Sequence, residues 1–196
     1  MKPQLILASA SPRRRELLDQ INVRYRVEVA DIDESPLPNE TPDALVQRLA
    51  LEKARAIWER SDKTLSVLGS DTLGQLDGEL LVKPTDFEDA RRMLLTMAGR
   101  KHEILSGVAL CSAAGEQVTL CRSTVWFREL SEQEIQDYWN SGEPADKAGA
   151  YAIQGLGAVF VERMEGSYSA VMGLPLFETA AMLAATGIYP LQSARV

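Results

Sequence analysis

Basic and hydroxyl side chains gather near the start of the chain. Residues 5–18 read LILASASPRRRELL, in which Ser11 and Pro12 are typical of a helix N-cap and a first helical residue. The arginines at 13–15 then fall in the first turn, where the helix dipole disfavours each cation by about 0.3–1 kcal/mol. Free backbone N–H groups and forked guanidinium donors suit phosphate oxygens. The pattern indicates either an exposed basic turn or, as we expect, a phosphate site comprising Ser9, Ser11, Arg13 and Arg14.

A lysine interrupts the apolar stripe of the helix expected over residues 41–58. Apolar residues recur there with helical spacing, and Lys53 falls inside the stripe. Such a side chain either extends outward to solvent or pairs with an anion. A phosphate site nearby favours the second interpretation.

A carboxylate follows the apolar run that precedes residues 69–72, which read GSDT. An aspartate at the end of a buried strand is unusual unless it is hydrogen-bonded or functional. Residues 77–78, Asp-Gly, predict a tight hairpin, and counting across its ladder places Lys83 level with Asp71 and Thr72. Asp71 is then half of a structural ion pair, or a general base beside a phosphate-binding cation.

Two further carboxylates, Asp33 and Glu34, lie in the acidic loop DIDESPLPNE over residues 31–40. Loop carboxylates are usually solvated. Hard oxygen ligands of this kind are also what Mg²⁺ or Mn²⁺ uses when it bridges a triphosphate.

A mixed α/β fold is expected to position these residues. Hairpins and crossovers both occur, since the Asp-Gly turn and a second turn predicted at 165–166 alternate with helical segments. Thr85 with Glu88 and Ser131 with Glu134 each predict a capping box. Strands are expected at 4–8, 25–30, 65–76, 79–84, 103–112 and 117–127, and helices at 12–20, 41–58, 85–99, 131–142 and 175–186.

The composition excludes several classes of protein. A net charge of −7 argues against a surface that coats nucleic acid. His102 is the single histidine, so zinc sites built on several histidines are excluded. Neither a P-loop nor a GxGxxG motif occurs. The two cysteines, Cys111 and Cys121, are expected to be reduced thiols.

The length of 196 residues indicates one domain over residues 1–196. No apolar stretch approaches the roughly 20 residues needed to cross a bilayer, so no membrane partner is expected. The first apolar run is too short for a signal-peptide core, which predicts a cytoplasmic protein. The sequence leaves a monomer and a homodimer open.

Six separated motifs resemble the Maf family of nucleotide pyrophosphatases. They are SASPRR, DIDE, EKA within the helix, GSDT, VKP and AGAYAIQGLG, which follow one another between residues 5 and 183. The dTTP/UTP pyrophosphatase subgroup is the most similar. The resemblance implies an elongated mixed sheet flanked by helices, in two lobes with a central cleft, related to inosine-triphosphate pyrophosphatases.

The resemblance also implies a reaction and roles for residues. The substrate would be a nucleoside triphosphate, hydrolysed to the monophosphate and pyrophosphate with a divalent cation, Mg²⁺, Mn²⁺ or Co²⁺. Asp71 matches the proton acceptor, and Glu34 is the expected metal ligand. Positions that distinguish substrate subgroups match Arg13, Thr72 and Gln154, and other polar cleft positions match Ser9, Arg14, Lys53 and Lys83.

Two alternatives remain open at this point. The first is a nucleotide-sensing regulator of cell division without turnover, a role associated with the family. The second is a 7-methyl-GTP pyrophosphatase, although that subgroup resembles tryptophan, glutamine and glutamate at the positions of Arg13, Thr72 and Gln154. A glutamine amide offers a donor beside an acceptor, which matches the N3–H and O4 of uracil and thymine. Modified pyrimidine nucleotides are a further substrate class.

Overall fold

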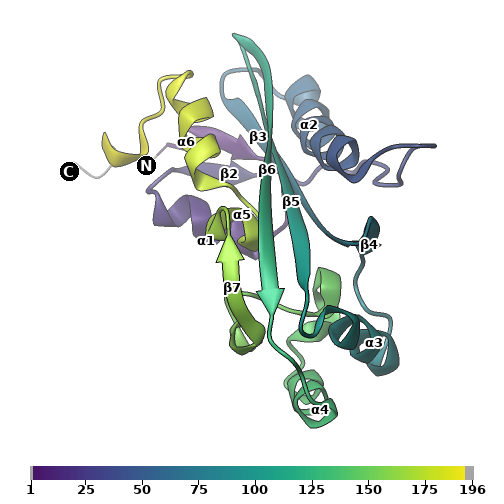
Figure 1. Ribbon diagram of the computed structural model, residues 1–196. Helices are drawn as coiled ribbons and strands as arrows, with labels where there is room; N and C mark the ends of the chain where they lie inside the picture. The colour runs from purple at the N-terminus through teal and green to yellow at the C-terminus, as the bar shows by residue number, and fades with distance from the viewer. Residues whose placement is uncertain (1, 193–196) are drawn as a thin grey trace.

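One mixed sheet runs through the computed structural model, which describes residues 2–192 (Figure 1). The strand order is β2-β1-β3-β5-β6-β7, and β4 also pairs with β3. The strands are β1 Leu5–Leu7, β2 Tyr25–Val27, β3 Ser66–Leu76, β4 Glu79–Leu81, β5 Lys101–Ser112, β6 Gly115–Phe127 and β7 Val161–Glu165. The helices are α1 Pro12–Gln20, α2 Pro42–Arg60, α3 Phe87–Met97, α4 Glu132–Asn140, α5 Tyr168–Met172 and α6 Leu176–Ala184. Short 3₁₀ helices are η1 Pro144–Asp146, η2 Ala148–Ala150, η3 Leu156–Phe160 and η4 Pro190–Gln192.

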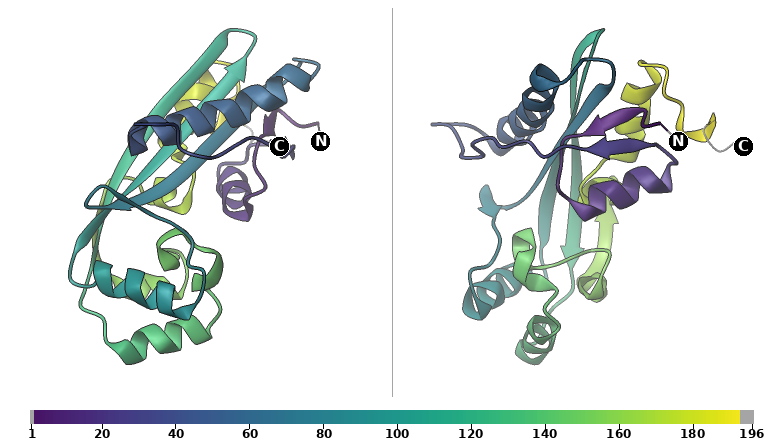
Figure 2. Two further views of the ribbon diagram at one scale, coloured as in Figure 1. Left: turned by 90° about the vertical axis from the view of Figure 1, so that its right-hand side faces the viewer. Right: turned by 180° about the vertical axis from the view of Figure 1, so that it is seen from behind.

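The long strands β3, β5 and β6 pair antiparallel and form the centre of the sheet, with helices at both of its ends. Figure 2 shows α3 and α4 at one end of these strands, and α1, β1, β2 and α6 toward the other end. Three clusters of buried apolar side chains form the core. One lies around α3 and α4, a second around α1 and α6, and a third under α2. The mixed sheet flanked by helices confirms the predicted fold class.

Two strands share one edge of β3. Strand β5 pairs with β3 from Val67 to Gln75, so β1 and β4 must both lie along the opposite edge. Strand β1 pairs in parallel with residues 66–68 and β4 pairs antiparallel with residues 74–76. Residues 69–73 therefore have no partner strand on that edge, and the sheet forks into two lobes there.

Close packing of α2 on β3 and β5 depends on two glycines. A Cβ atom at Gly69 would lie 2.2 Å from the carbonyl oxygen of Ala50, and one at Gly107 would lie 2.4 Å from that of Val46. Both carbonyls belong to α2. Because no side chain separates the helix from the strands, α2 lies close enough to bring Lys53 over β3.

Several local predictions are confirmed. Helix α1 begins at Pro12, and the Asp77-Gly78 turn has φ values of 53° and 86°, as a type I′ hairpin requires. The register of that hairpin pairs Leu76 with Glu79, as counted from the sequence. The capping box of Ser131 and Glu134 is present at the start of α4.

Two other local predictions are wrong. Asp86, not Thr85, is the N-cap of α3, and its side chain accepts a hydrogen bond from the N–H of Asp89. Aspartate satisfies this free N–H at least as well as threonine, and the helix starts one residue later than a Thr85–Glu88 box would allow. The turn predicted at 165–166 does not join two strands, because β7 pairs with β6 and the chain enters α5 after Gly166. Ser167 caps α5 by accepting from the N–H of Ala170.

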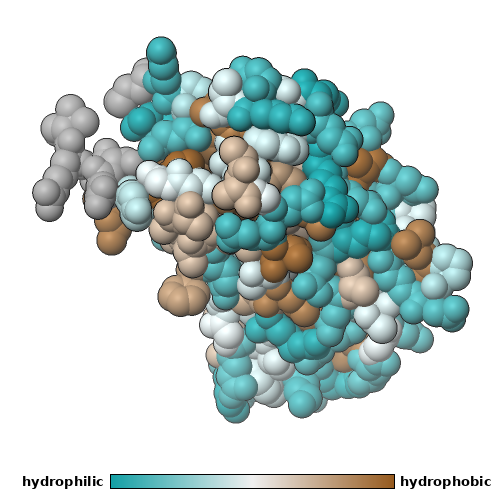
Figure 3. Space-filling model, turned by 90° about the horizontal axis from the view of Figure 1, so that it is seen from above, coloured by the Kyte–Doolittle hydropathy of each residue, from teal (hydrophilic) through white to brown (hydrophobic). Residues whose placement is uncertain are grey.

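Hydrophilic side chains cover most of the face seen from above, with hydrophobic ones scattered among them (Figure 3). No helix within residues 2–192 is long and apolar enough to cross a membrane.

Candidate active site

A cleft of about 490 Å³ opens at the fork in the sheet. One wall is the N-terminal end of α1, the floor is the middle of β3, and the other wall is the segment from η1 to Gln154. Most of the residues predicted for the site line this cleft. They are Ser11, Arg13, Arg14, Asp71, Thr72, Lys83 and Gln154.

Hydrogen bonds fix Arg14 at the start of α1. Its Nη1 donates to the Oγ of Ser9 at 3.1 Å, and its Nε donates to the carbonyl of Gly173 at 2.9 Å. The Ser9 Oγ also accepts from the N–H of Ser11 at 3.2 Å. Ser9 thus orders the turn before α1 and contacts Arg14, but it is not among the residues that line the cleft.

The carbonyl of Gly173 joins α1 to the floor of the cleft. It accepts from Arg14 and from the buried Oγ of Ser70, at 3.1 Å, and more weakly from Thr72 Oγ1 at 3.4 Å. Thr72 also shares a hydrogen bond of 3.0 Å with Ser106 on β5. No pattern in the sequence marked Gly173, since its role depends on a carbonyl group that every residue type carries.

Arg13 and Arg14 differ in their surroundings. Burial lowers the pKa of the Arg14 guanidinium, and the negative charges of Asp71 and Glu34 act in the opposite direction. Arg13 lines the cleft without a hydrogen bond or ion pair to any described residue. Arg13 is therefore available to an anionic ligand, whereas Arg14 is already held in place.

Lys53 joins two carboxylates. Its Nζ lies 2.7 Å from Asp71 Oδ1 and 2.9 Å from Glu34 Oε1. Lys53 is 8% exposed, so the interpretation in which it extends into solvent is wrong. It pairs with anions inside the stripe of α2 that faces the sheet.

The predicted pairing of Lys83 with Asp71 is wrong. Strand β4 ends at Leu81, so the ladder does not continue to Lys83, and the cation beside Asp71 is Lys53. Lys83 is exposed and lines the same cleft. It remains within the candidate site as a separate cation.

The opposite wall holds residues that the sequence analysis did not single out. Lys147 and Asp146 line the cleft and form an ion pair, and the hydrogen bond from Lys147 lowers the pKa of Asp146. Tyr151 also lines the cleft, and its hydroxyl shares a hydrogen bond of 2.7 Å with Nε2 of His102. Burial lowers the pKa of His102 to about 4. Lys147 and Tyr151 stand in the glycine-rich motif DKAGAYAIQGLG, but spacing alone gave them no role.

The two carboxylates beside Lys53 are oxygen donors of the kind that a divalent cation uses in proteins. No group of three or more His, Cys, Asp or Glu able to hold a metal occurs in the described part of the chain. Mg²⁺ usually binds one or two carboxylates and completes its shell with substrate phosphates and water. Glu34 and Asp71 are carboxylates of this type, and each already contacts Lys53 Nζ. Asp33 accepts instead from the N–H of Ser35, within its own loop.

Comparisons with known proteins agree on one family. The family model described as "Maf-like protein" matches residues 4–186. A protein of Hahella chejuensis named dTTP/UTP pyrophosphatase is 54% identical, over 94% of this chain and 93% of its own. Proteins of Aliivibrio fischeri and Vibrio cholerae with the same name are each 48% identical, over 93% and 92% of this chain and 98% and 96% of their own.

A solved structure, the Staphylococcus aureus Ham1 protein, overlaps 64% of this chain and 72% of its own with a TM-score of 0.48 and 16% identity. The family model and the curated relatives each cover nearly the whole of the chain. The chain therefore belongs to the Maf family.

Proposed function

We propose that this chain hydrolyses dTTP and UTP to the nucleoside monophosphate and pyrophosphate. The observation that supports this most directly is a cleft in which Arg13, Lys83 and Lys147 line the walls while the carboxylate of Asp71 lies on the floor. A polyanion matches the cations, and a carboxylate beside it can accept a proton. The name shared by relatives at 48–54% identity supplies the substrate class.

In the proposed reaction, a water oxygen attacks the α-phosphorus, and the bond from that phosphorus to the bridging oxygen of the β-phosphate breaks. Asp71 accepts a proton from the attacking water, and pyrophosphate leaves with the electron pair of the broken bond. Lys53 holds the Asp71 carboxylate through the 2.7 Å ion pair. Arg13 and Lys83 lie where they can neutralise the triphosphate and the leaving group. Electrostatic stabilisation of this kind supplies much of the catalysis in phosphoryl transfer.

We propose Glu34 as the protein ligand of a divalent cation, Mg²⁺, Mn²⁺ or Co²⁺, with Asp71 beside it. When bound, such a cation withdraws charge from the phosphate oxygens. Arg48 keeps Glu34 in reach, because its guanidinium binds both oxygens of Glu40, at 2.6 and 2.8 Å, and the carbonyl of Ser35, at 3.0 Å. These contacts attach the acidic loop to α2 beside Lys53.

Several predictions from the sequence accompany this proposal. Gln154 is exposed and lines the cleft, which supports a role for its side chain in recognising the base. Glutamine at this position favours uracil and thymine over 7-methylguanine, whose neighbouring donors suit a carboxylate.

A cytoplasmic location and a homodimer stay predictions. A nucleotide sensor of cell division is the second candidate, and Asp71 argues for turnover because a sensor needs no base.

The products of the reaction test the proposal. Purified protein is incubated with dTTP, UTP, GTP and 7-methyl-GTP in the presence of Mg²⁺, Mn²⁺ or Co²⁺, and monophosphate, pyrophosphate and orthophosphate are separated. We expect pyrophosphate from dTTP and UTP and a metal-dependent rate. Orthophosphate as the sole phosphate product would identify a phosphatase, and binding without any product would favour the sensor.

Asp71→Asn tests the assignment of the base. The amide keeps the shape of the side chain but accepts no proton, so kcat should fall by about 10²–10⁴ while nucleotide binding changes little. Asp137→Asn on the exposed face of α4 is the matched control and should leave kcat unchanged. A variant at residue 71 that keeps more than about a tenth of the wild-type kcat would show that another group is the base.

A further inference from the structure

The loop that carries Gln154 is folded around one carboxylate. Glu143 Oε2 accepts from the N–H of Leu156 at 2.9 Å, and Oε1 accepts from the N–H of Gly157 at 3.0 Å. Glu143 follows α4 and lies 11 residues before Gln154 in the chain. Its carboxylate thus fixes the backbone just after Gln154.

A buried phenol fixes the backbone on the other side. The hydroxyl of Tyr138 accepts from the N–H of Ala152 at 3.1 Å and donates to Glu143 Oε1 at 2.7 Å. Tyr138 is 5% exposed, and its ring packs edge-on against Phe160 with centroids 4.9 Å apart. Because that packing restrains the ring, the hydroxyl is a fixed point for both Ala152 and Glu143.

Two glycines let the loop approach these groups. A Cβ atom at Gly155 would lie 2.1 Å from Glu143 Oε2, and one at Gly157 would lie 2.7 Å from the hydroxyl of Tyr138. A side chain at either position would displace the carboxylate or the phenol from its hydrogen bonds. The QGLG sequence is therefore matched to the pair formed by Tyr138 and Glu143.

We propose that Tyr138 and Glu143 are positioning residues for base selection: together they fix residues 152–157 so that Gln154 meets the base of a pyrimidine nucleoside triphosphate. This proposal rests on the proposed function, since it assumes that Gln154 contacts the base. Neither Tyr138 nor Glu143 lines the cleft, so they act through the loop and not on the substrate.

Gln154 depends on this support. Its side chain is exposed and forms no hydrogen bond with the described residues, so its direction follows from its backbone. The three loop N–H groups held by Tyr138 and Glu143 lie on both sides of it. A misplacement of about 1 Å in a positioned group can reduce a rate by about 100-fold.

The charge of Glu143 suits the role. Burial acts to raise its pKa, but hydrogen bonds from Tyr138, Gly157 and Leu156 outweigh that effect, and the pKa is lowered from its usual value. Glu143 is therefore an anion at neutral pH, and an anion accepts from several N–H groups more strongly than a neutral amide does.

Tyr138→Phe and Glu143→Gln test the proposal in the full-length chain. The phenyl ring keeps the packing on Phe160 but loses both hydrogen bonds, and the amide of the second variant turns a donor toward a loop N–H group. We expect the ratio of kcat/KM for dTTP to that for GTP to fall about tenfold in each variant, chiefly through a higher KM for dTTP. UTP should follow dTTP.

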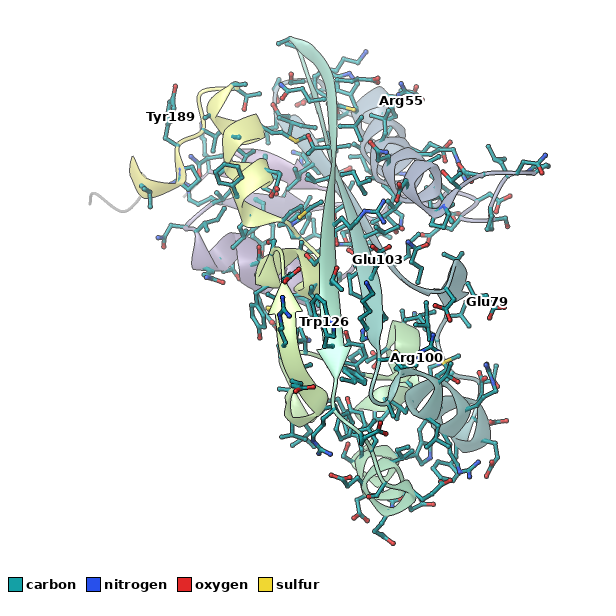
Figure 4. All side chains as sticks on the ribbon, in the orientation of Figure 1. Arg55, Glu79, Arg100, Glu103, Trp126 and Tyr189 are labelled. Atoms are coloured by element: carbon teal, nitrogen blue, oxygen red, sulfur yellow. The ribbon has the colours of Figure 1, made fainter. Side chains whose placement is uncertain are left out.

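Matched controls carry the same substitutions elsewhere. Tyr168→Phe changes a half-exposed tyrosine on α5, and Glu79→Gln changes a glutamate that points outward from β4 (Figure 4). Both should keep the wild-type ratio. A lower melting temperature with an unchanged dTTP-to-GTP ratio in Tyr138→Phe and Glu143→Gln would show a purely structural role and overturn the proposal.

Gln154→Ala separates this inference from the function on which it rests. If Gln154 reads the base, this variant loses selectivity by itself, and adding Glu143→Gln to it lowers the ratio no further. A full additional loss in the double variant would show that Glu143 acts by another route. An unchanged ratio in Gln154→Ala would instead refute the base contact itself, and the inference with it.

Discussion

Replacing Lys53 with methionine should destabilise the fold more than the loss of most cations would. Lys53 is 8% exposed and its Nζ contacts both Asp71, at 2.7 Å, and Glu34, at 2.9 Å. Methionine keeps the length and the apolar contacts of the side chain on α2. It removes the positive charge that both carboxylates contact and leaves the more distant Arg14 guanidinium to act on them.

The magnitude follows from the burial of the partners. The side chain of Asp71 is 13% exposed, so its pair with Lys53 is nearly buried, and removing one partner of a buried pair costs about 3–5 kcal/mol. The side chain of Glu34 is 57% exposed, and its pair contributes at most about 1 kcal/mol. We expect Lys53→Met to lower the free energy of unfolding by roughly 3 kcal/mol, at the lower end of the range for a buried pair because Asp71 lines an open cleft.

A double-mutant cycle with Asp71→Asn isolates the ion pair. Asp71→Asn leaves Lys53 paired with Glu34, so its own loss should be smaller. The double variant buries a neutral amide beside methionine and should be more stable than Lys53→Met alone, with a coupling energy of about 1–3 kcal/mol. Urea unfolding followed by far-ultraviolet circular dichroism gives each free energy, provided that the m value stays constant. Losses that add within about 0.5 kcal/mol would refute the assignment of a buried pair.

Two further predictions concern the packing that surrounds the site. Because the pKa of His102 is about 4 in the folded chain against 6.5 for a free histidine, the unfolded chain takes up a proton first as the pH falls, and stability is lost between those values. Between pH 7 and pH 5 the wild-type chain should therefore lose about 2 kcal/mol more unfolding free energy than His102→Gln does. Urea unfolding of both proteins at the two pH values measures this difference, and equal losses in the two proteins would contradict the reasoning. Gly69→Ala places a Cβ atom 2.2 Å from the carbonyl oxygen of Ala50, which is backbone and cannot rotate away, so we expect a loss of at least about 1–3 kcal/mol in unfolding free energy. The same substitution at Gly78, where φ is 86° and a Cβ atom would meet no neighbour, measures backbone strain without a clash. An unchanged unfolding free energy in Gly69→Ala would contradict the predicted clash.

Features set by neighbouring residues could be predicted from the sequence. The Asp77-Gly78 turn fixed the register of β3 with β4 because both residues accept positive φ values. The start of α1 at Pro12 followed from the fixed φ of proline. Where two adjacent candidates compete, as Thr85 and Asp86 do for the cap of α3, local chemistry does not rank them reliably and the boundary moves by one residue.

The partner of Asp71 could not be predicted in this way. Counting along the hairpin assumed that β4 continues as far as Lys83, but β4 ends at Leu81. The actual partner, Lys53, comes from α2, and its approach depends on two glycines in strands that the helix covers. Such contacts follow from how the helix docks on the sheet, and the spacing of residues along one chain segment does not encode them.

The fork in the sheet explains how a polar site can exist in the middle of a long strand. Asp71 pairs with Gly107 on β5, so one edge of β3 is fully hydrogen-bonded at this position. On the other edge β1 gives way to the turn before α1 after Leu7, and β4 begins to pair only at Gly74. A continuous neighbour strand would close the cleft beside Asp71. Because both neighbours stop short, the carboxylate is held on a central strand and still lines the cleft, which is the combination that the proposed role of Asp71 as a base requires.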